Sequence, residues 1–298
     1  MSEFLQQLIN GISLGSIYAL IALGYTMVYG ILKFINFAHG EVFMLGAFSG
    51  YYIAGLTGAQ GNTFLGFLFV IISTMIITAM VGVIIEKVAY KPLRKETKLT
   101  VLITAIGVSL FLQYTGQLIF GASPRAYPNL LENFKINIGE VSIGSNQIIV
   151  IAISILLMLL LTIIVKHTKI GIAVRAVSNN LTASALMGIN IDNVISFTFI
   201  LGSSLAGAAG VLYSINYPSI EPLMGLLPGI KAFVAAVLGG IGNFAGAAVG
   251  GVIIGTIETL TVGYISPTFR DAIAFGILII ILLFKPTGIF GKSEAEKV

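Results

Sequence analysis

Long apolar runs separated by short polar stretches make up most of this chain. Nine of the runs are candidates for membrane-spanning helices, because a helix needs about 20 mostly apolar residues to cross a bilayer. The nine runs are Leu8–Leu32, Val42–Leu56, Phe64–Ile85, Leu99–Phe120, Gln147–Val165, Val194–Asn216, Gly229–Ile241, Phe244–Val262 and Ala272–Phe284. This pattern predicts an all-α, polytopic membrane protein with about eight or nine spans. We expect a single membrane domain that covers residues 1–298.

The seventh run is too short to cross a bilayer. Gly229–Ile241 has 13 residues, which extend about 20 Å as a helix, whereas the hydrocarbon core is about 30 Å thick. We predict a half-helix or a re-entrant segment here. The backbone polar groups at its ends must then be satisfied by protein or by a water-filled cavity.

Small residues crowd the sequence next to this short run. Glycines four residues apart let two helices approach closely, so helix packing alone explains most such pairs. Their density here also predicts the centre of the protein and the wall of a solute pathway, or an interface with another subunit. The residues in this set are Gly239, Gly240, Gly242, Asn243, Gly246 and Gly250.

The polar stretch Gly171–Asn193 differs from the other loops, because it is amphipathic and carries helix-forming residues between two spans. Ser178 is a candidate N-cap, and Gly188-Ile189-Asn190 is a candidate stop. We predict a short helix at the membrane surface that docks on a partner protein. A helix that only anchors the loop to the surface is the alternative.

The composition excludes several classes of protein. Hydrophobic residues make up 57% of the chain and charged residues 9%, whereas soluble domains carry about 25% charged residues. The chain has no Cys and two His, which excludes disulfides, thiolate zinc sites, iron–sulfur clusters and His-rich metal sites. Its basic residues sit in short loops between spans, so they do not indicate a nucleic-acid partner.

The distribution of Lys and Arg predicts the orientation, because basic residues favour cytoplasmic loops. Of 16 such residues, 12 fall in segments that we place in the cytoplasm: Lys33, Lys87, Lys91, Arg94, Lys95, Lys98, Lys166, Lys169, Arg175, Lys285, Lys292 and Lys297. The loop 166–193 is then cytoplasmic, and the loop 122–146 is external. The N-terminus is external if the seventh run counts as a crossing, and the C-terminus is cytoplasmic.

Two charged residues, Lys231 and Glu258, lie within the predicted spans, and His39 and Glu41 precede the second span. A charge at the bilayer centre costs at least about 2.5–3.5 kcal/mol, so each needs a pathway, a partner or an interface. For Glu41 and Lys231 the alternative is a position at the membrane interface. For Glu258 it is snorkelling to water. The carboxylates are too few for a proton relay.

No motif for ATP hydrolysis or other catalysis is recognisable in the chain. Gly291-Lys292-Ser293 resembles the end of a phosphate-binding loop, but the first glycine of that motif would fall at Pro286 and no strand–helix unit surrounds it. We expect a chain without enzymatic activity. If it pumps a solute, the energy comes from another polypeptide.

Several segments together resemble the LivH type of branched-chain amino acid ABC permeases. They are Asn36-Phe37-Ala38-His39-Gly40-Glu41, Met44-Leu45-Gly46-Ala47, Arg175-Ala176, Asn179-Asn180, Ala183, Ala185-Leu186-Met187-Gly188-Ile189-Asn190, Ala206-Gly207-Ala208-Ala209-Gly210, Val237-Leu238-Gly239-Gly240-Ile241-Gly242-Asn243, Gly246, Gly250-Gly251 and Lys285-Pro286-Thr287-Gly288-Ile289-Phe290-Gly291. They occur in the order and spacing of that family between about residue 10 and residue 291. One departure is Asn193, where relatives often carry Arg.

The resemblance implies the membrane-spanning subunit of an ATP-binding cassette importer in the bacterial inner membrane, with a pathway for branched-chain amino acids. Its partners would be a second related permease, in a heterodimer or a homodimer, two cytoplasmic ATPase subunits that hold ATP and Mg²⁺, and a periplasmic or lipid-anchored binding protein. This chain itself would hold no cofactor.

The resemblance also implies which residues couple transport to the ATPase: Arg175, Ala176, Asn179, Asn180, Ala183, Leu186, Met187 and Gly188. Three alternatives stay open. They are a permease of the same family for urea or short amides, a self-sufficient ion-coupled carrier, and a scaffold subunit that does not transport.

Overall fold

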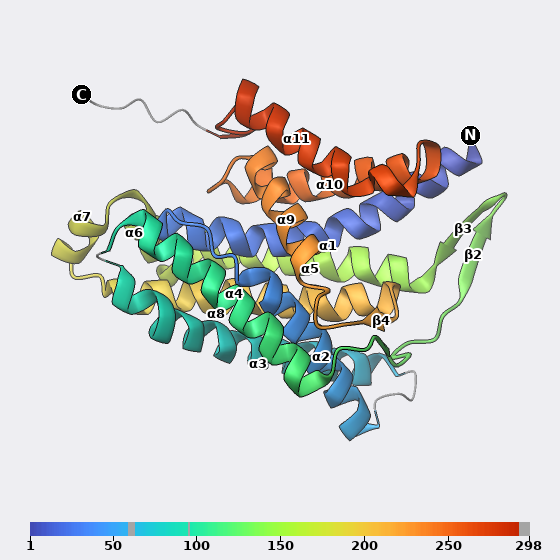
Figure 1. Cartoon of the computed structure of the whole chain (residues 1–298), viewed down its shortest axis with the longest axis horizontal. Coiled ribbons are helices and arrows are strands. Elements are labelled where there is room, and N and C mark those ends of the chain that lie inside the picture. The colour runs from blue at the N-terminus through green and yellow to red at the C-terminus, as the bar shows by residue number, and fades with distance from the viewer. Residues whose placement is uncertain (59–62, 95, 292–298) are drawn as a thin grey trace.

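The computed structural model describes residues 1–58, 63–94 and 96–291, which form a bundle of helices (Figure 1). The α-helices are α1 (Ser2–Leu32), α2 (His39–Thr57), α3 (Phe64–Ile85), α4 (Lys98–Phe120), α5 (Ser145–His167), α6 (Lys169–Asn179), α7 (Leu181–Leu186), α8 (Ile191–Asn216), α9 (Leu226–Gly239), α10 (Phe244–Tyr264) and α11 (Arg270–Phe284). A π-helical turn (Glu86–Tyr90) and a 3₁₀ turn (Lys91–Leu93) extend α3, and a second 3₁₀ turn (Pro267–Phe269) precedes α11. Of the phosphate-loop-like triplet, Lys292 and Ser293 lie outside the described residues.

Every predicted span is a helix in the structure. Within the described residues, seven helices are long and apolar enough to cross a membrane, and α2 and α9 come in addition to these. α9 has 14 residues and extends about 21 Å at 1.5 Å per residue, which confirms the short seventh segment. The prediction of an all-α, polytopic membrane protein is therefore correct.

The core of the bundle lies along α1, which is almost wholly buried among α5, α8, α9 and α10. Small residues make this contact close. A Cβ atom on Gly15 would lie 2.6 Å from Cα of Val252, and one on Gly255 would lie 2.4 Å from Cα of Gly15. The glycines four residues apart on α1 and α10 thus bring two helix backbones together, as small residues do in membrane helix pairs.

The outer helices expose large apolar side chains. Leu118 on α4 and Leu283 on α11 are 86% and 73% exposed, and the apolar surface of α3 and α5 is similarly open. In a soluble protein this much exposed apolar surface would be a liability. In a membrane protein these faces contact lipid or other membrane-spanning subunits.

The two ends of the bundle carry different structures (Figure 1). α6 and α7 project from one end, and α11 runs back toward that end. The N-terminus and a hairpin of β2 (Lys135–Ile138) and β3 (Val141–Gly144) occupy the other end. The predicted external loop 122–146 therefore lies at the opposite end from the predicted cytoplasmic loop 166–193. A second short pair, β1 (Arg125–Ala126) with β4 (Ser219–Ile220), ties this loop to the end of α8.

Candidate functional site

The chain turns sharply from α5 into the projecting helix α6. The Thr168 hydroxyl caps α6 by accepting a hydrogen bond from the Gly171 amide at 3.1 Å. A Cβ atom on Gly171 would lie 2.3 Å from the carbonyl oxygen of Ile164, so only glycine fits this close approach. Val174 and Val177 on the same face of α6 are buried, which fixes the helix against the bundle.

Asn180 divides the projecting segment into two helices. Its amide donates to the carbonyl of Ala176 at 3.0 Å, which ends α6, and its side-chain oxygen accepts from the Ala183 amide at 2.9 Å, which begins α7. The prediction of one helix with Ser178 as its N-cap is therefore wrong. Ser178 lies inside α6, whereas Asn180 has the extended backbone that an N-cap requires. Gly188, with φ at +81°, forms the predicted stop.

The predicted coupling residues lie along this segment, and most of them are exposed. Leu186 and Met187 are 83% and 82% exposed, and Ala183 and Asn179 also face outward. Arg175 is exposed and donates to the Lys166 carbonyl at 3.3 Å. Exposed apolar side chains at the end of a short projecting helix favour a partner surface that covers them. No residue of this set is shown to contact a partner, so the coupling role stays a prediction.

A network of ion pairs connects the beginning of α8 to the turns after α3. The Arg94 guanidinium contacts the carboxylates of both Glu86 and Asp192, the latter at 2.6 Å. Glu86 is fully buried in the π-helical turn and also accepts a hydrogen bond from the Ser196 hydroxyl at 2.8 Å. Lys91, which is half-exposed, pairs with Asp192 at 2.7 Å. Since α8 follows α7 directly, this network fixes the base of the projecting segment.

Replacing Arg94 with Ala is expected to lower the thermal stability of the protein. The buried Glu86 would keep only the Ser196 hydroxyl, and an under-satisfied buried polar group costs about 1–3 kcal/mol. Lys91→Ala is the matched control, because an exposed ion pair contributes about 0–1 kcal/mol. Thermal unfolding of the detergent-solubilised protein measures both variants. Equal melting temperatures for the Arg94 variant and the wild type would show that the network does not hold this base together.

A second group of charged side chains is buried between α1, α9, α10 and α11. The Glu258 carboxylate accepts hydrogen bonds from Lys231 at 3.0 Å, from the Tyr18 hydroxyl at 3.0 Å and from Nε of Arg270. Lys231 also pairs with Asp271 at 2.6 Å. Glu258 and Lys231 are 1% and 3% exposed. Each side chain is held inside the protein by an opposite charge, as buried charges require.

Two cavities open beside this buried charge. One of about 400 Å³ is lined by Glu258, Arg270 and several amide side chains. The other, of about 370 Å³, is lined by tyrosines, charged residues and aliphatic residues, and it shares Tyr217 and Arg270 with the first. Both fall in the lower range of volumes that hold small molecules. The structure thus brings the predicted residues Lys231 and Glu258 together next to space for a solute.

His39 and Glu41 form a separate buried group in the first turn of α2. Each is 1% exposed, so both side chains are enclosed by the protein. The His39 ring packs edge-on against Tyr25 at 4.9 Å, and Glu41 lies 3.4 Å from the Ser109 hydroxyl. Nε2 of His39 has no hydrogen-bond partner among the described residues. A role of this pair in a pathway remains a prediction.

Most of the predicted glycine set packs inside this chain, whereas Gly242 is exposed, with φ at +96° and no atom within 4 Å of a Cβ position. A Cβ atom on Gly246 would lie 2.1 Å from the carbonyl oxygen of Gly239, and one on Gly250 would lie 2.1 Å from that of Ala235. These glycines join the end of α9 to the beginning of α10. Whether the same region also borders a solute pathway or a second subunit stays a prediction.

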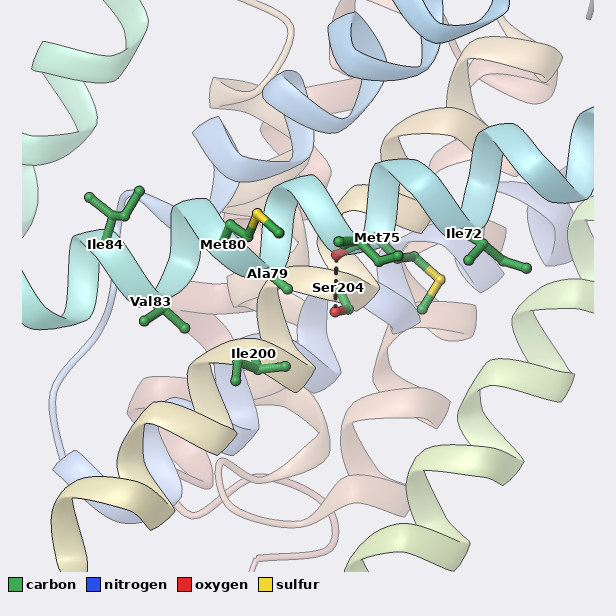
Figure 2. Close-up of a pocket in the computed structure, with 9 residues that line it drawn as sticks. Ile72, Met75, Ala79, Met80, Val83, Ile84, Ile200 and Ser204 are labelled. Atoms are coloured by element: carbon green, nitrogen blue, oxygen red, sulfur yellow. Dashed lines mark hydrogen bonds between the residues drawn. The ribbon is translucent and has the colours of Figure 1, made fainter. Parts of the chain in front are cut away.

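A larger groove of about 770 Å³ lies on the outer face between α3 and α8 (Figure 2). The side chains that line it are aliphatic or Met, with Ser204 as the one hydroxyl, and that hydroxyl already donates to the Met75 carbonyl at 3.2 Å. A wall without free polar groups suits lipid or an apolar helix. It does not suit a charged or strongly polar solute.

Comparisons with known proteins agree with this architecture. The sequence matches the family described as "branched-chain amino acid transport system / permease component" over residues 7–282. The chain belongs to this family. It is 44% identical to the high-affinity branched-chain amino acid transport system permease protein BraD of Pseudomonas aeruginosa and, likewise, to LivH of Escherichia coli strain K12, in each case over 99% of this chain and 98% of the relative.

More distant proteins are similar in sequence or in fold. A probable branched-chain amino acid transport permease protein LivH of Methanocaldococcus jannaschii is 29% identical over 93% of this chain and 89% of its own length. The solved structure of PsaBC from Streptococcus pneumoniae in complex with Fab is 13% identical and covers 95% of this chain and 92% of its own, with a TM-score of 0.50. At this identity the likeness concerns the fold alone.

Two of the segments on which the permease resemblance rests meet in the structure. The amide of Ile289 donates to the Leu238 carbonyl at 2.8 Å, so the segment after α11 pairs with the end of α9. Gly240 and Gly288 have φ at +99° and +78°, and a Cβ atom on Gly288 would lie 2.4 Å from the Gly240 amide. Asn243 caps α10 and donates to the Phe290 carbonyl at 3.0 Å. In this permease, these residues therefore connect α9, α10 and the C-terminal segment.

Sequence reasoning missed Arg94, Glu86 and Arg270 as site residues. In the sequence, Arg94 is one of several basic residues of a predicted cytoplasmic loop, and Arg270 lies outside the predicted span Ala272–Phe284. A signal was nevertheless present. Glu258 and Lys231 are unmatched charges within apolar runs, and each requires an opposite charge from another segment.

Proposed function

We propose that this chain is the membrane-spanning subunit of an ATP-binding cassette importer and forms a pathway for branched-chain, hydrophobic amino acids. The observation that carries the proposal is the projecting segment α6–α7, whose apolar residues Leu186 and Met187 are more than four-fifths exposed. It lies at the opposite end from the N-terminus (Figure 1). An exposed apolar helix at one end of a membrane bundle is suited to bind a soluble ATPase subunit.

The proposed complex contains a second related permease, two cytoplasmic ATPase subunits and a substrate-binding protein outside the membrane. ATP and Mg²⁺ would bind the ATPase subunits and not this chain. The membrane is the bacterial inner membrane, with α6–α7 in the cytoplasm and the β2–β3 hairpin outside. Support comes from the excess of Lys and Arg near α6–α7 and from relatives that are named permease proteins of branched-chain amino acid transport systems.

Uptake by cells that lack the gene tests the proposed substrate class. We expect the uptake of labelled leucine at low external concentration to be lost and to return when the gene is restored, while urea uptake stays unchanged. Urea is the matched probe, because it is polar, uncharged and lacks the aliphatic side chain. Loss of urea uptake with normal leucine uptake would contradict the proposal.

A further inference from the structure

The cavity of about 370 Å³ at the N-terminal end of the bundle combines three kinds of wall. One part is cationic, one is anionic and one is aliphatic. Arg270 begins α11, Glu221 lies in the turn between β4 and α9, and Leu223 and Leu227 lie in that turn and at the start of α9. These segments are far apart in the sequence, so only the folded structure shows that their side chains line one cavity.

Arg270 supplies the cationic wall. It contacts the buried Glu258 through Nε only, and its two terminal nitrogens have no hydrogen-bond partner in the part of the chain that the structure describes. Its side chain is 37% exposed and lines both cavities. The planar edge of a guanidinium matches a carboxylate through two parallel hydrogen bonds. Because Nε is held by Glu258, this edge is fixed in position before any anion arrives.

Glu221 supplies the anionic wall. It is exposed, and it forms no ion pair with any residue for which the structure gives a position. Asp271, the other acidic residue that lines this cavity, is half-exposed and already pairs with Lys231 at 2.6 Å. The carboxylate of Glu221 is therefore available to accept hydrogen bonds from an ammonium group.

The aliphatic wall completes the pattern. Leu223 and Leu227 are each 44% exposed on the same cavity, beside the rings of Tyr213 and Tyr217. A cation, an anion and an apolar surface together complement a zwitterion that carries an aliphatic side chain. Binding of any ligand removes water from the charged groups of Arg270 and Glu221. An uncharged amide offers no opposite charge in place of that water, so its binding is disfavoured.

We propose that this cavity binds zwitterionic aliphatic α-amino acids on their way through the membrane. Arg270 binds the α-carboxylate, Glu221 binds the α-ammonium group, and Leu223 and Leu227 contact the side chain. The inference rests on the proposed function of amino-acid import and adds to it a selecting site within the permease itself. The binding protein is then not the sole source of specificity.

Protection of a single cysteine tests the site. The chain has no Cys, so Ser219→Cys places one thiol on the wall of this cavity. The assembled complex, without its binding protein, is treated with N-ethylmaleimide in the presence of L-leucine, leucinamide or 4-methylpentanoate. We expect L-leucine to slow the modification, and the two analogues, each of which lacks one charge, to need concentrations about 10–100-fold higher, as expected when a hydrogen bond between charged groups is lost. Ala122→Cys, in the exposed loop after α4, is the control that no ligand should protect.

Two substitutions in the Ser219→Cys background identify the binding groups. Arg270→Gln and Glu221→Gln should each raise the leucine concentration that gives half-protection by about 10–100-fold. Glu221 is exposed and forms no ion pair with any described residue, so the Glu221→Gln variant should assemble normally. This variant therefore tests the proposal even if the Arg270→Gln variant fails to fold. Unchanged protection in the Glu221 variant, or equal protection by leucine and both analogues, would overturn the proposal.

ATP-driven leucine import by the complete complex separates this inference from the function on which it rests. If the wild type imports leucine but leucine protects no thiol in the cavity, the binding site is wrong and the importer stands. If the wild-type complex imports no leucine, the proposed function itself fails.

Discussion

Substituting Asp for Ala183 is expected to abolish ATP-driven uptake while the permease stays folded in the membrane. Ala183 is exposed at the third position of α7, where a negative charge favours a helix by about 0.3–1 kcal/mol. In the docked complex the same carboxylate would be buried without a partner, at a cost of about 3–5 kcal/mol. The affinity for the ATPase should therefore fall by at least about 100-fold. Co-purification of the ATPase subunits with the tagged permease measures this loss.

Ala122→Asp is the matched control for this variant. Ala122 is also an exposed alanine, but it lies in the loop after α4 and not on the α6–α7 segment. We expect the control to retain the ATPase subunits and full uptake. Normal assembly and transport by the Ala183 variant would show that α7 does not contact the ATPase.

Replacing Gly246 with Leu is expected to remove most of the folded protein from the membrane. The Cβ atom alone would lie 2.1 Å from the Gly239 carbonyl oxygen, so α9 and α10 must separate. Overpacking in a core costs about 1–3 kcal/mol or more. Here the new side chain would clash with a backbone carbonyl, which cannot move away by changing a side-chain rotamer. Fluorescence-detected size-exclusion of the solubilised protein measures the yield of folded material.

Gly276→Leu provides the comparison on α11. A Cβ atom on Gly276 meets no atom within 4 Å, so this glycine tolerates a side chain on the lipid-facing or partner-facing surface. We expect a normal folded yield. A normal yield for Leu at position 246 would mean that the contact between α9 and α10 is looser than the structure shows.

The spans could be predicted from the sequence because each one is a local property. An apolar run of about 20 residues must be helical in a bilayer whatever its neighbours are, and even the shortness of α9 follows from counting residues. The N-cap within the projecting segment could not be fixed in the same way. Ser178 and Asn180 are both suitable residues, and only the packing of Val174 and Val177 against the bundle carries α6 through Ser178.

The charge networks were beyond sequence reasoning for a different reason. Glu258 on α10 and Lys231 on α9 stand out in the sequence as costly charges in apolar runs. Their partners Arg270 and Asp271 both lie at the beginning of α11, a separate helix. The pairing of Glu86 with Arg94 likewise depends on the π-helical and 3₁₀ turns that extend α3, which a sequence pattern does not distinguish from a regular helix. Composition and spacing identify the groups that need partners, and the tertiary arrangement decides which partners they obtain.

The most direct test of the account is leucine transport by reconstituted proteoliposomes. With the second permease, the ATPase subunits and the binding protein present, we expect leucine to accumulate only when ATP and Mg²⁺ reach the ATPase side. Vesicles that contain this chain alone should hydrolyse no ATP and accumulate no leucine under a proton or sodium gradient, since the chain has neither a complete phosphate-binding loop nor a relay of membrane carboxylates. Gradient-driven accumulation of leucine in those vesicles would contradict the account and identify the chain as a self-sufficient carrier.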